Sequence, residues 1–343
     1  MEEWREAAIE MTEAAYDLEV ADSEWFPQIL TRGLPLIDRG FGVAGFVGKR
    51  SPPSGAVEIE TMHVASGPVD FPSHLLRVLA ELPPERLSKQ VKAGVQLLSE
   101  RIEYDPTLLD AWKRHIDYAK DALGITALDT DGRGVQIVSL LPDATQIRPR
   151  TRRQWRMITA HLSAGLRLRR ALHQADSQTE HGDLPFGADA LIDPSVFEVT
   201  DASPAAQTPN AREVLRDAAM RIDRARARLR KHDAAEALAI WCALIRGRWS
   251  LVDWFDTDGR RYMIALQNAP TISDSRGLTE REAQVTGYAA LGESHKMIAY
   301  RLGISRSRVT TLLRSAMRKL SVRTQAELVA KMQLFATHED RAP

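Results

Sequence analysis

The sequence of 343 residues contains a single cysteine, Cys242, which excludes an intramolecular disulfide and is typical of a reducing cytoplasm. Its apolar neighbours favour a core thiol over a redox sensor, because a reactive thiol needs exposed, electropositive surroundings. No apolar run approaches the roughly 18 residues that span a membrane, and Met1 precedes a charged segment instead of a secretion signal. We therefore expect a soluble, cytoplasmic protein without a membrane partner.

The sequence also lacks an excess of charge, because 46 Lys and Arg face 46 Asp and Glu. Only local basic segments can therefore indicate a polyanionic partner. The common catalytic motifs are missing: there is no GxxxxGK(S/T), no GxGxxG after a strand, no HExxH, no CxxC pair and no GxSxG. We expect neither an enzyme nor a protein with a cofactor or a metal site.

The strongest local signals lie in the C-terminal part of the chain. Thr279 and Glu282 have the spacing of a capping box, in which each side chain bonds the backbone amide of the other residue. Gly303 is suited to end a second helix in the left-handed conformation, and Ser305 is suited to begin a third. A short helix, a turn with glycine and another helix predict a helix-turn-helix, whose later helix lies in the major groove of DNA.

The third predicted helix separates apolar from basic residues. Its apolar side chains step by three or four positions and face inward together: Val309, Leu313, Ala316 and Leu320. Cations at the periphery suit phosphates, whereas short hydroxyls and one long arginine near the helix start suit base edges. Thr324 with Glu327 predicts the cap of a fourth helix. The residues that we expect to contact DNA are Lys296, Ser305, Arg306, Arg308, Thr310, Thr311, Arg314, Arg318 and Lys319.

Residues 278–332 contain ten Lys or Arg against four Glu, an excess that a DNA-binding module needs. This stretch resembles the C-terminal DNA-binding domain of LuxR-type (GerE-like) bacterial transcription regulators. The residues that carry the resemblance are Leu278, Thr279, Arg281, Glu282, Lys296, Ile298, Ala299, Leu302, Ile304, Ser305, Val309, Lys319, Leu320, Val322, Glu327 and Leu328.

The resemblance implies roles for individual residues. The implied base contacts are made by Thr310, Thr311 and Arg314. The implied phosphate contacts are made by Lys296, Ser305, Arg306 and Lys319. Three positions depart from the family pattern, since Arg308 replaces a threonine, Leu312 a histidine and Gln325 an arginine. The operator of a better-known member therefore cannot be transferred to this chain.

The N-terminal half combines helices with two predicted hairpins. The predicted helices are 2–18, 24–39, 72–81, 84–98 and 149–174, and the predicted strands are 42–48, 56–64, 122–128 and 134–141. This order resembles that of GAF domains in pattern and length, without a shared motif, and implies an antiparallel sensor sheet. A ligand pocket between sheet and helices would be lined by His63, Trp112, His115 and Tyr118, although such residues more often serve plain packing.

The predicted helix 149–174 has an apolar stripe with nearly heptad spacing that would suit pairing with a second copy: Trp155, Ile158, Leu162 and Leu166. Its arginines favour a solvated face matched to acidic surface elsewhere, with phosphate contact as the alternative. These arginines are Arg150, Arg152, Arg153, Arg156, Arg167, Arg169 and Arg170.

A central segment follows, with predicted strands 188–192, 196–199, 248–255 and 261–267 and predicted helices 211–230 and 234–245. It resembles a reduced PAS-like module. The sequence DTDGR occurs twice, at 129–133 and 256–260, and predicts two tight hairpin turns in preference to calcium loops, because further carboxylates are missing.

Together these patterns predict an α+β multidomain protein. The predicted domains are a GAF-like antiparallel-sheet sensor domain at 1–175, a central helical, PAS-like module at 187–270 and an all-α four-helix LuxR-type helix-turn-helix domain at 276–335. The predicted function is sequence-specific regulation of transcription by a homodimer on double-stranded DNA, with RNA polymerase as a partner. A small molecule or partner protein at the N-terminal region would modulate DNA binding. The alternative is an adaptor whose helix-turn-helix contacts the transcription machinery, and weak salt dependence would identify it.

Overall fold

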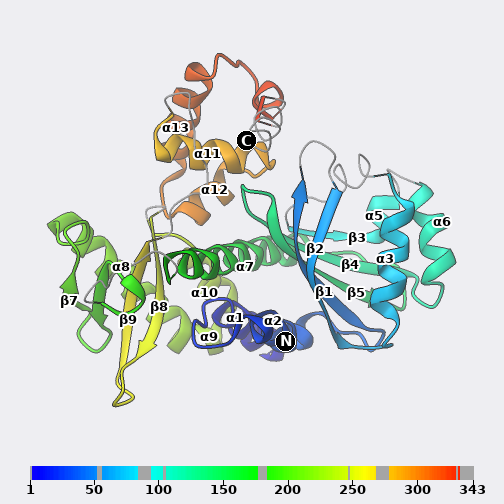
Figure 1. Ribbon diagram of the computed structural model, residues 1–343, viewed down its shortest axis with the longest axis horizontal. Coiled ribbons are helices and arrows are strands. Elements are labelled where there is room, and N and C mark those ends of the chain that lie inside the picture. Colours follow the sequence, from blue (N-terminus) through cyan, green and yellow to red (C-terminus); the bar gives the residue numbers. More distant parts are fainter. Residues whose placement is uncertain are drawn as a thin grey trace.

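The computed structural model of the chain describes residues 2–51, 56–83, 94–102, 106–176, 184–245, 248–267, 278–329 and 331–332. The fold is α+β, with two antiparallel sheets and the long helix α7 (Pro149–Asp176) running between them (Figure 1). The C-terminal helices lie on one side of α7, and the N-terminal helix α1 (Glu2–Ala14) lies on the other (Figure 1). Within the described ranges, no helix combines the length and hydropathy that crossing a membrane requires.

The first sheet contains both predicted hairpins and has the strand order β2-β1-β5-β4-β3, antiparallel throughout. Its strands are β1 (Val43–Ser51), β2 (Ala56–Ser66), β3 (Gly94–Leu97), β4 (Asp121–Leu128) and β5 (Arg133–Leu141). The predicted helix 84–98 is wrong over its described part, where β3 precedes the short helix α5 (Leu98–Ile102). A short apolar run fits either structure, and pairing with β4 decides for the strand.

Helices cover both faces of this sheet. Helix α2 (Asp22–Ile37) and α7 pack on one face, where a Cβ on Gly45 would lie 2.7 Å from Phe26 Cζ. Helices α3 (Phe71–Glu81) and α6 (Pro106–His115) form a separate cluster on the other face, around Leu75 and Trp112. The close approach of α2 therefore depends on the missing side chain at position 45.

The second sheet has the order β7-β6-β9-β8 and is also antiparallel. Its strands are β6 (Ala190–Asp193), β7 (Glu198–Ala202), β8 (Trp249–Phe255) and β9 (Arg261–Gln267). The connecting helices are α8 (Pro209–Arg224), a π-helical turn (Ala225–Leu229), α9 (Arg230–His232) and α10 (Ala234–Ile240). Strands β8 and β9 and helix α8 stand where the sequence predicted them. The predicted strand 196–199 overlaps β7 only at its last two residues, because 194–197 form a turn, and α10 ends five residues before the predicted boundary at 245.

Helix α7 is the centre of the molecule, because every residue from 157 to 169 is buried. The stripe expected to pair with a second copy instead packs inside this chain, and Ile158 and Leu162 are fully buried. One continuous apolar core joins α1, α2, α7 and the second sheet. The dimer expectation for this stripe is therefore wrong, and no solvent layer separates the first two predicted domains.

The arginines of α7 mostly pair with acidic residues of the same chain, as the solvated-face interpretation predicted. The pairs are Arg152 with Glu100, Arg167 with Asp129, Arg169 with Asp22 and Arg170 with Asp131. Two of these arginines, Arg167 and Arg169, are buried, so the face is less solvated than the pattern suggested.

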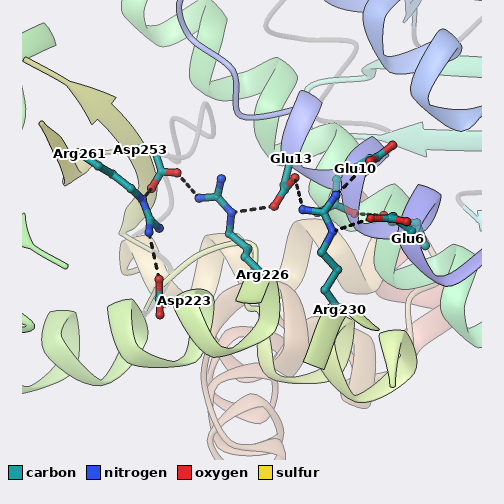
Figure 2. Close-up of polar contacts among 10 residues, drawn as sticks. Glu6, Glu10, Glu13, Asp223, Arg226, Arg230, Asp253 and Arg261 are labelled. Carbon is teal, nitrogen blue, oxygen red and sulfur yellow. Dashed lines mark hydrogen bonds and ion pairs between the residues drawn. The ribbon is translucent and has the colours of Figure 1, made fainter. Parts of the chain in front are cut away.

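A network of ion pairs ties α1 to the helices that follow α8 (Figure 2). Arg226 donates to Glu13 Oε1 at 2.9 Å and to Asp253. Arg230 lies within 3.6 Å of a carboxylate oxygen of Glu6, 3.0 Å of one of Glu10 and 3.4 Å of one of Glu13. Figure 2 shows Arg261 closing the network, at 3.1 Å from Asp223 and 3.2 Å from Asp253. Arg226 and Arg230, which follow α8, thus neutralise most of the acidic face of α1, and Arg32 of α2 adds a longer contact to Glu10 at 3.8 Å.

We predict that Arg226→Ala lowers the free energy of unfolding by about 2 kcal/mol, because Glu13 and Asp253 lose their shortest charged hydrogen bonds and keep only the longer ion pairs to Arg230 and Arg261. The matched control is Arg224→Ala. The Arg224 side chain is 64% exposed, and its Nη2 lies 3.8 Å from Glu236 Oε1. That exposed pair should contribute at most about 0.5 kcal/mol. Urea denaturation followed by circular dichroism measures both free energies of unfolding. Equal losses in the two variants would show that the ion-pair network does not stabilise the contact between α1 and the helices that follow α8.

Candidate nucleic-acid interface

The helix-turn-helix consists of α11 (Glu280–Ala290), α12 (His295–Leu302) and α13 (Arg306–Lys319), and residues 325–329 and 331–332 are also helical. The predicted caps are present. Thr279 and Glu282 form both bonds of the capping box. Gly303 adopts the left-handed conformation with φ of 59°, and Ser305 accepts a hydrogen bond from the Arg308 amide. These local signals set the angle at which α13 leaves α12.

The predicted inward face of α13 is confirmed. Val309 and Ala316 are fully buried, Leu313 and Leu320 nearly so, against Ile298 and the rest of a compact core. Leu312, which stands where the family has histidine, is also buried. With these positions inside, the opposite side of α13 is turned to solvent.

The outer face of α13 presents cations that have no acidic partner among the described residues. Arg306, Arg308, Arg314 and Arg318 are all exposed. Lys296 at the start of α12 is exposed as well. Because these charges are uncompensated, they create a local positive potential in a chain whose net charge is zero.

The hydroxyls of this face have local hydrogen bonds. Thr310 Oγ1 donates to the Arg306 carbonyl at 3.1 Å and lies 3.3 Å from His295 Nδ1. Thr311 Oγ1 donates to the Ser307 carbonyl at 3.0 Å. Each hydroxyl can still accept a hydrogen bond, so the face offers acceptors beside its cationic donors.

Lys319 differs from the other predicted DNA contacts. Its Nζ donates to Glu282 Oε2 at 2.6 Å, within the domain itself. Burial alone would raise the pKa of Glu282, but hydrogen bonds from Lys319, Ser315 and Thr279 outweigh it and lower the pKa to about 2. Lys319 thus joins the end of α13 to the start of α11, which the pattern of exposed cations did not indicate.

The structure does not bring the four predicted pocket residues together. His63 lies on the sheet face that α2 covers, whereas Trp112 is buried in the core on the opposite face. His115 pairs with Glu81 at 2.6 Å, and Tyr118 is 37% exposed. Among the described residues, no group of three or more His, Cys, Asp or Glu could hold a metal ion.

A hollow of about 290 Å³ lies elsewhere, between α8, the segment after α10 and the turn of the helix-turn-helix. Side chains from several sequence-distant segments form it, so no sequence motif could have indicated it. Its lining residues are Glu213, Val214, Asp217, Ala218, Arg221, Ile222, Ile240, Cys242, Ile245 and Gly303.

The capped helices, the buried face of α13 and its exposed arginines agree with a comparison to known families. Residues 276–332 match the family of bacterial regulatory proteins, luxR family. This part of the chain is therefore a LuxR-family domain, and the resemblance seen in the sequence is confirmed for it. No curated protein matches the chain.

Among solved structures, the chain is similar to SdiA of Escherichia coli, with a TM-score of 0.28 and 10% identity over 98% of this chain and 97% of that chain. A structure of SdiA in complex with octanoyl-rac-glycerol has the same TM-score, with 12% identity over 96% of this chain and 93% of that chain. A TM-score this low carries no argument about the fold or ligand of this protein.

We predict that the Lys319–Glu282 pair makes stability depend on acid pH. Because the pKa of Glu282 is lowered from 4.5 to about 2, its carboxylate contributes stability above pH 4.5 that is lost as the pH falls towards 2. The difference in free energy of unfolding between wild type and Glu282→Gln should therefore shrink from pH 5 to pH 2.5. Urea denaturation at both pH values tests this, and a constant difference would contradict it.

Proposed function

We propose that this protein is a sequence-specific DNA-binding regulator of transcription that inserts α13 into the major groove. The observation that carries the proposal is the exposed face of α13, whose arginines have no acidic partner within the described part of the chain, in a LuxR-family domain. A helix with a free basic face and a packed apolar face has the form that groove binding requires. The domain points to a regulator instead of an enzyme.

The middle of α13 suits base contacts, and its ends suit phosphates. We assign base contacts to Thr310, Thr311 and Arg314, because they lie one turn or more inside the helix start. Lys296, Ser305, Arg306, Arg308 and Arg318 are assigned to phosphates. The Glu282 carboxylate offsets the charge of Lys319, so we expect Lys319 to add less to DNA affinity than Arg318.

The remainder of the chain is proposed to control this domain. The five-stranded sheet with helices on both faces supports a GAF-like sensor in outline, and the second sheet supports a PAS-like module. The hollow beside Gly303 is a better ligand site than the four residues predicted from sequence, because its walls include the turn of the helix-turn-helix. A homodimer on a two-fold-related site, a four-helix C-terminal domain and contact with RNA polymerase complete the proposal.

We predict that Arg314→Ala weakens binding to a duplex selected from random sequence by about 1 to 3 kcal/mol and relaxes sequence choice. Arg318→Ala is the matched control on the same helix. It should weaken selected and random duplexes alike and reduce the salt slope by about one. Fluorescence anisotropy with both duplexes measures these effects. Equal losses on the two duplexes for Arg314→Ala would exclude it as a base reader.

A further inference from the structure

The LuxR-family domain docks on α7 through α11 and α12, while α13 stays exposed (Figure 1). Arg301 of α12 donates to Ser163 Oγ of α7 at 2.6 Å, and its backbone carbonyl accepts from the Leu244 amide at 2.9 Å. Arg301 also pairs with Glu293 at 2.7 Å. The docked face is therefore polar as well as buried, and its hydrogen bonds fix one orientation of the domain.

His161 of α7 links the docked domain to Tyr16, which follows α1. Tyr300 of α12 donates to the Leu238 carbonyl, which can only accept, so His161 Nε2 must donate to the Tyr300 hydroxyl at 2.7 Å. His161 Nδ1 is then the acceptor for the Tyr16 hydroxyl at 2.9 Å. Burial, with Arg301 nearby, lowers the pKa of His161 to about 3, which keeps the ring neutral in this wiring.

A second link runs to the turn between β4 and β5. Arg167 Nη1 donates to Asp129 Oδ1 at 2.8 Å and lies 2.8 Å from the Tyr288 hydroxyl of α11. Tyr288 in turn donates to Asp129 Oδ1 at 3.2 Å. All three residues are buried, and Asp129 is the first residue of the turn that connects β4 to β5. A carboxylate oxygen of the β4–β5 turn thus contacts the LuxR-family domain directly.

The same turn sequence occurs twice in the chain, so the two turns can be compared directly. The sequence DTDGR forms the turn at 129–133 and again at 256–260 between β8 and β9. The backbones agree: Gly132 and Gly259 have φ of 81° and 75°, and each amide donates to the carbonyl of the first aspartate, at 3.1 and 2.9 Å. Any difference between the two turns therefore comes from their surroundings.

The first aspartate behaves differently in the two copies. Asp256 Oδ1 caps its own turn by accepting from the amides of Asp258 at 3.0 Å and Arg260 at 2.8 Å. Asp129 Oδ1 instead accepts from Arg167 and Tyr288, outside its turn. Among the described residues, no donor reaches Asp129 Oδ2, which is buried. The same five residues thus allow two positions of the first aspartate, and the outward position leaves one carboxylate oxygen unsatisfied.

We propose that Asp129 is a latch with two positions, one holding the LuxR-family domain on α7 and one capping its own turn as Asp256 does. This inference rests on the proposed function and adds its regulation. A ligand or partner that moves the β4–β5 turn biases the latch, because it acts on a position that both states use. Since α13 is exposed in the latched state, the latch controls the orientation of the domain and leaves its contact surface accessible.

Distance measurements without DNA test the latch directly. Spin labels go on Lys113→Cys of α6 and Ala326→Cys, both exposed, in a full-length Cys242→Ser background. Pulsed electron paramagnetic resonance should give one narrow distance for the unaltered latch. Asp129→Asn should broaden it, because a neutral amide oxygen holds Arg167 more weakly than a carboxylate does. Asp256→Asn, the matched change in the other DTDGR turn, should leave it narrow.

Tyr288→Phe is a milder second variant, because it removes one hydroxyl and keeps the buried ring. It should also broaden the distance, and far-UV circular dichroism checks that each variant is folded. A narrow, unchanged distance in both Asp129→Asn and Tyr288→Phe would overturn the latch. Equal broadening in Asp256→Asn would overturn it as well, because the effect would then belong to DTDGR turns in general.

DNA binding separates the latch from the proposed function. Asp129→Asn should change affinity for a duplex with one half-site by less than about twofold, because α13 is untouched. On a duplex with two half-sites it should lower affinity by about fivefold or more, the size of a typical coupling between sites. If Asp129→Asn has the same affinity as wild type on both duplexes, the latch is not coupled to DNA binding. If wild type itself binds neither duplex, the proposed function is wrong, whereas the distance measurements still test the latch.

Discussion

The middle of α7 is buried on all sides, from residue 157 to 169, and this burial imposes a strict requirement on its polar residues. Helix α7 carries His161, Ser163, Arg167 and Arg169 inside the molecule, and an unpaired polar group there would be strongly unfavourable. Their partners come from the segment between α1 and α2, from a hairpin turn of the first sheet, and from the two docked helices of the LuxR-family domain. Satisfying these groups therefore fixes how the units of the chain assemble.

This arrangement makes the chain more integrated than three domains on linkers. The core that joins α1 to the second sheet, and the arginines that neutralise Glu10 and Glu13, leave the first two units little freedom to move apart. The LuxR-family domain is held by directional hydrogen bonds at its docked face and by apolar contacts, since Met297 belongs to the main core and Leu244 to the core of the domain. Its polar contacts are the part that can exchange between two hydrogen-bonded states, which suits the control of DNA binding.

Features set by local sequence could be predicted. The capping box at Thr279, the left-handed Gly303 and both DTDGR turns depend on residues within five positions of one another, so the sequence contains their cause. The exposed arginines of α13 followed from helical periodicity alone. The prediction for β3 failed because pairing with β4, distant in sequence, decides that segment.

Features set by tertiary packing could not be predicted. The heptad-like stripe around Ile158 and Leu162 is the same in a helix that pairs with a copy and in one buried within its own chain, and periodicity cannot separate the two. Likewise, the sequence pattern presents Lys319 as one more exposed cation, and only the fold shows that it pairs with Glu282. The hollow near Gly303 and the outward position of Asp129 arise only when sequence-distant segments meet.

The proposed function requires that the C-terminal domain binds duplex DNA through the exposed cations of α12 and α13. The affinity of the full-length protein for duplex DNA, measured as a function of salt concentration, tests this requirement. The four exposed cations assigned to phosphates are Lys296, Arg306, Arg308 and Arg318. With about 0.9 counterion released per phosphate contact, they predict a slope of about −3 to −4 per DNA-binding domain in a plot of log affinity against log salt. Binding that is insensitive to salt, or absent at low salt, would contradict the claim and favour an adaptor that docks through apolar contacts.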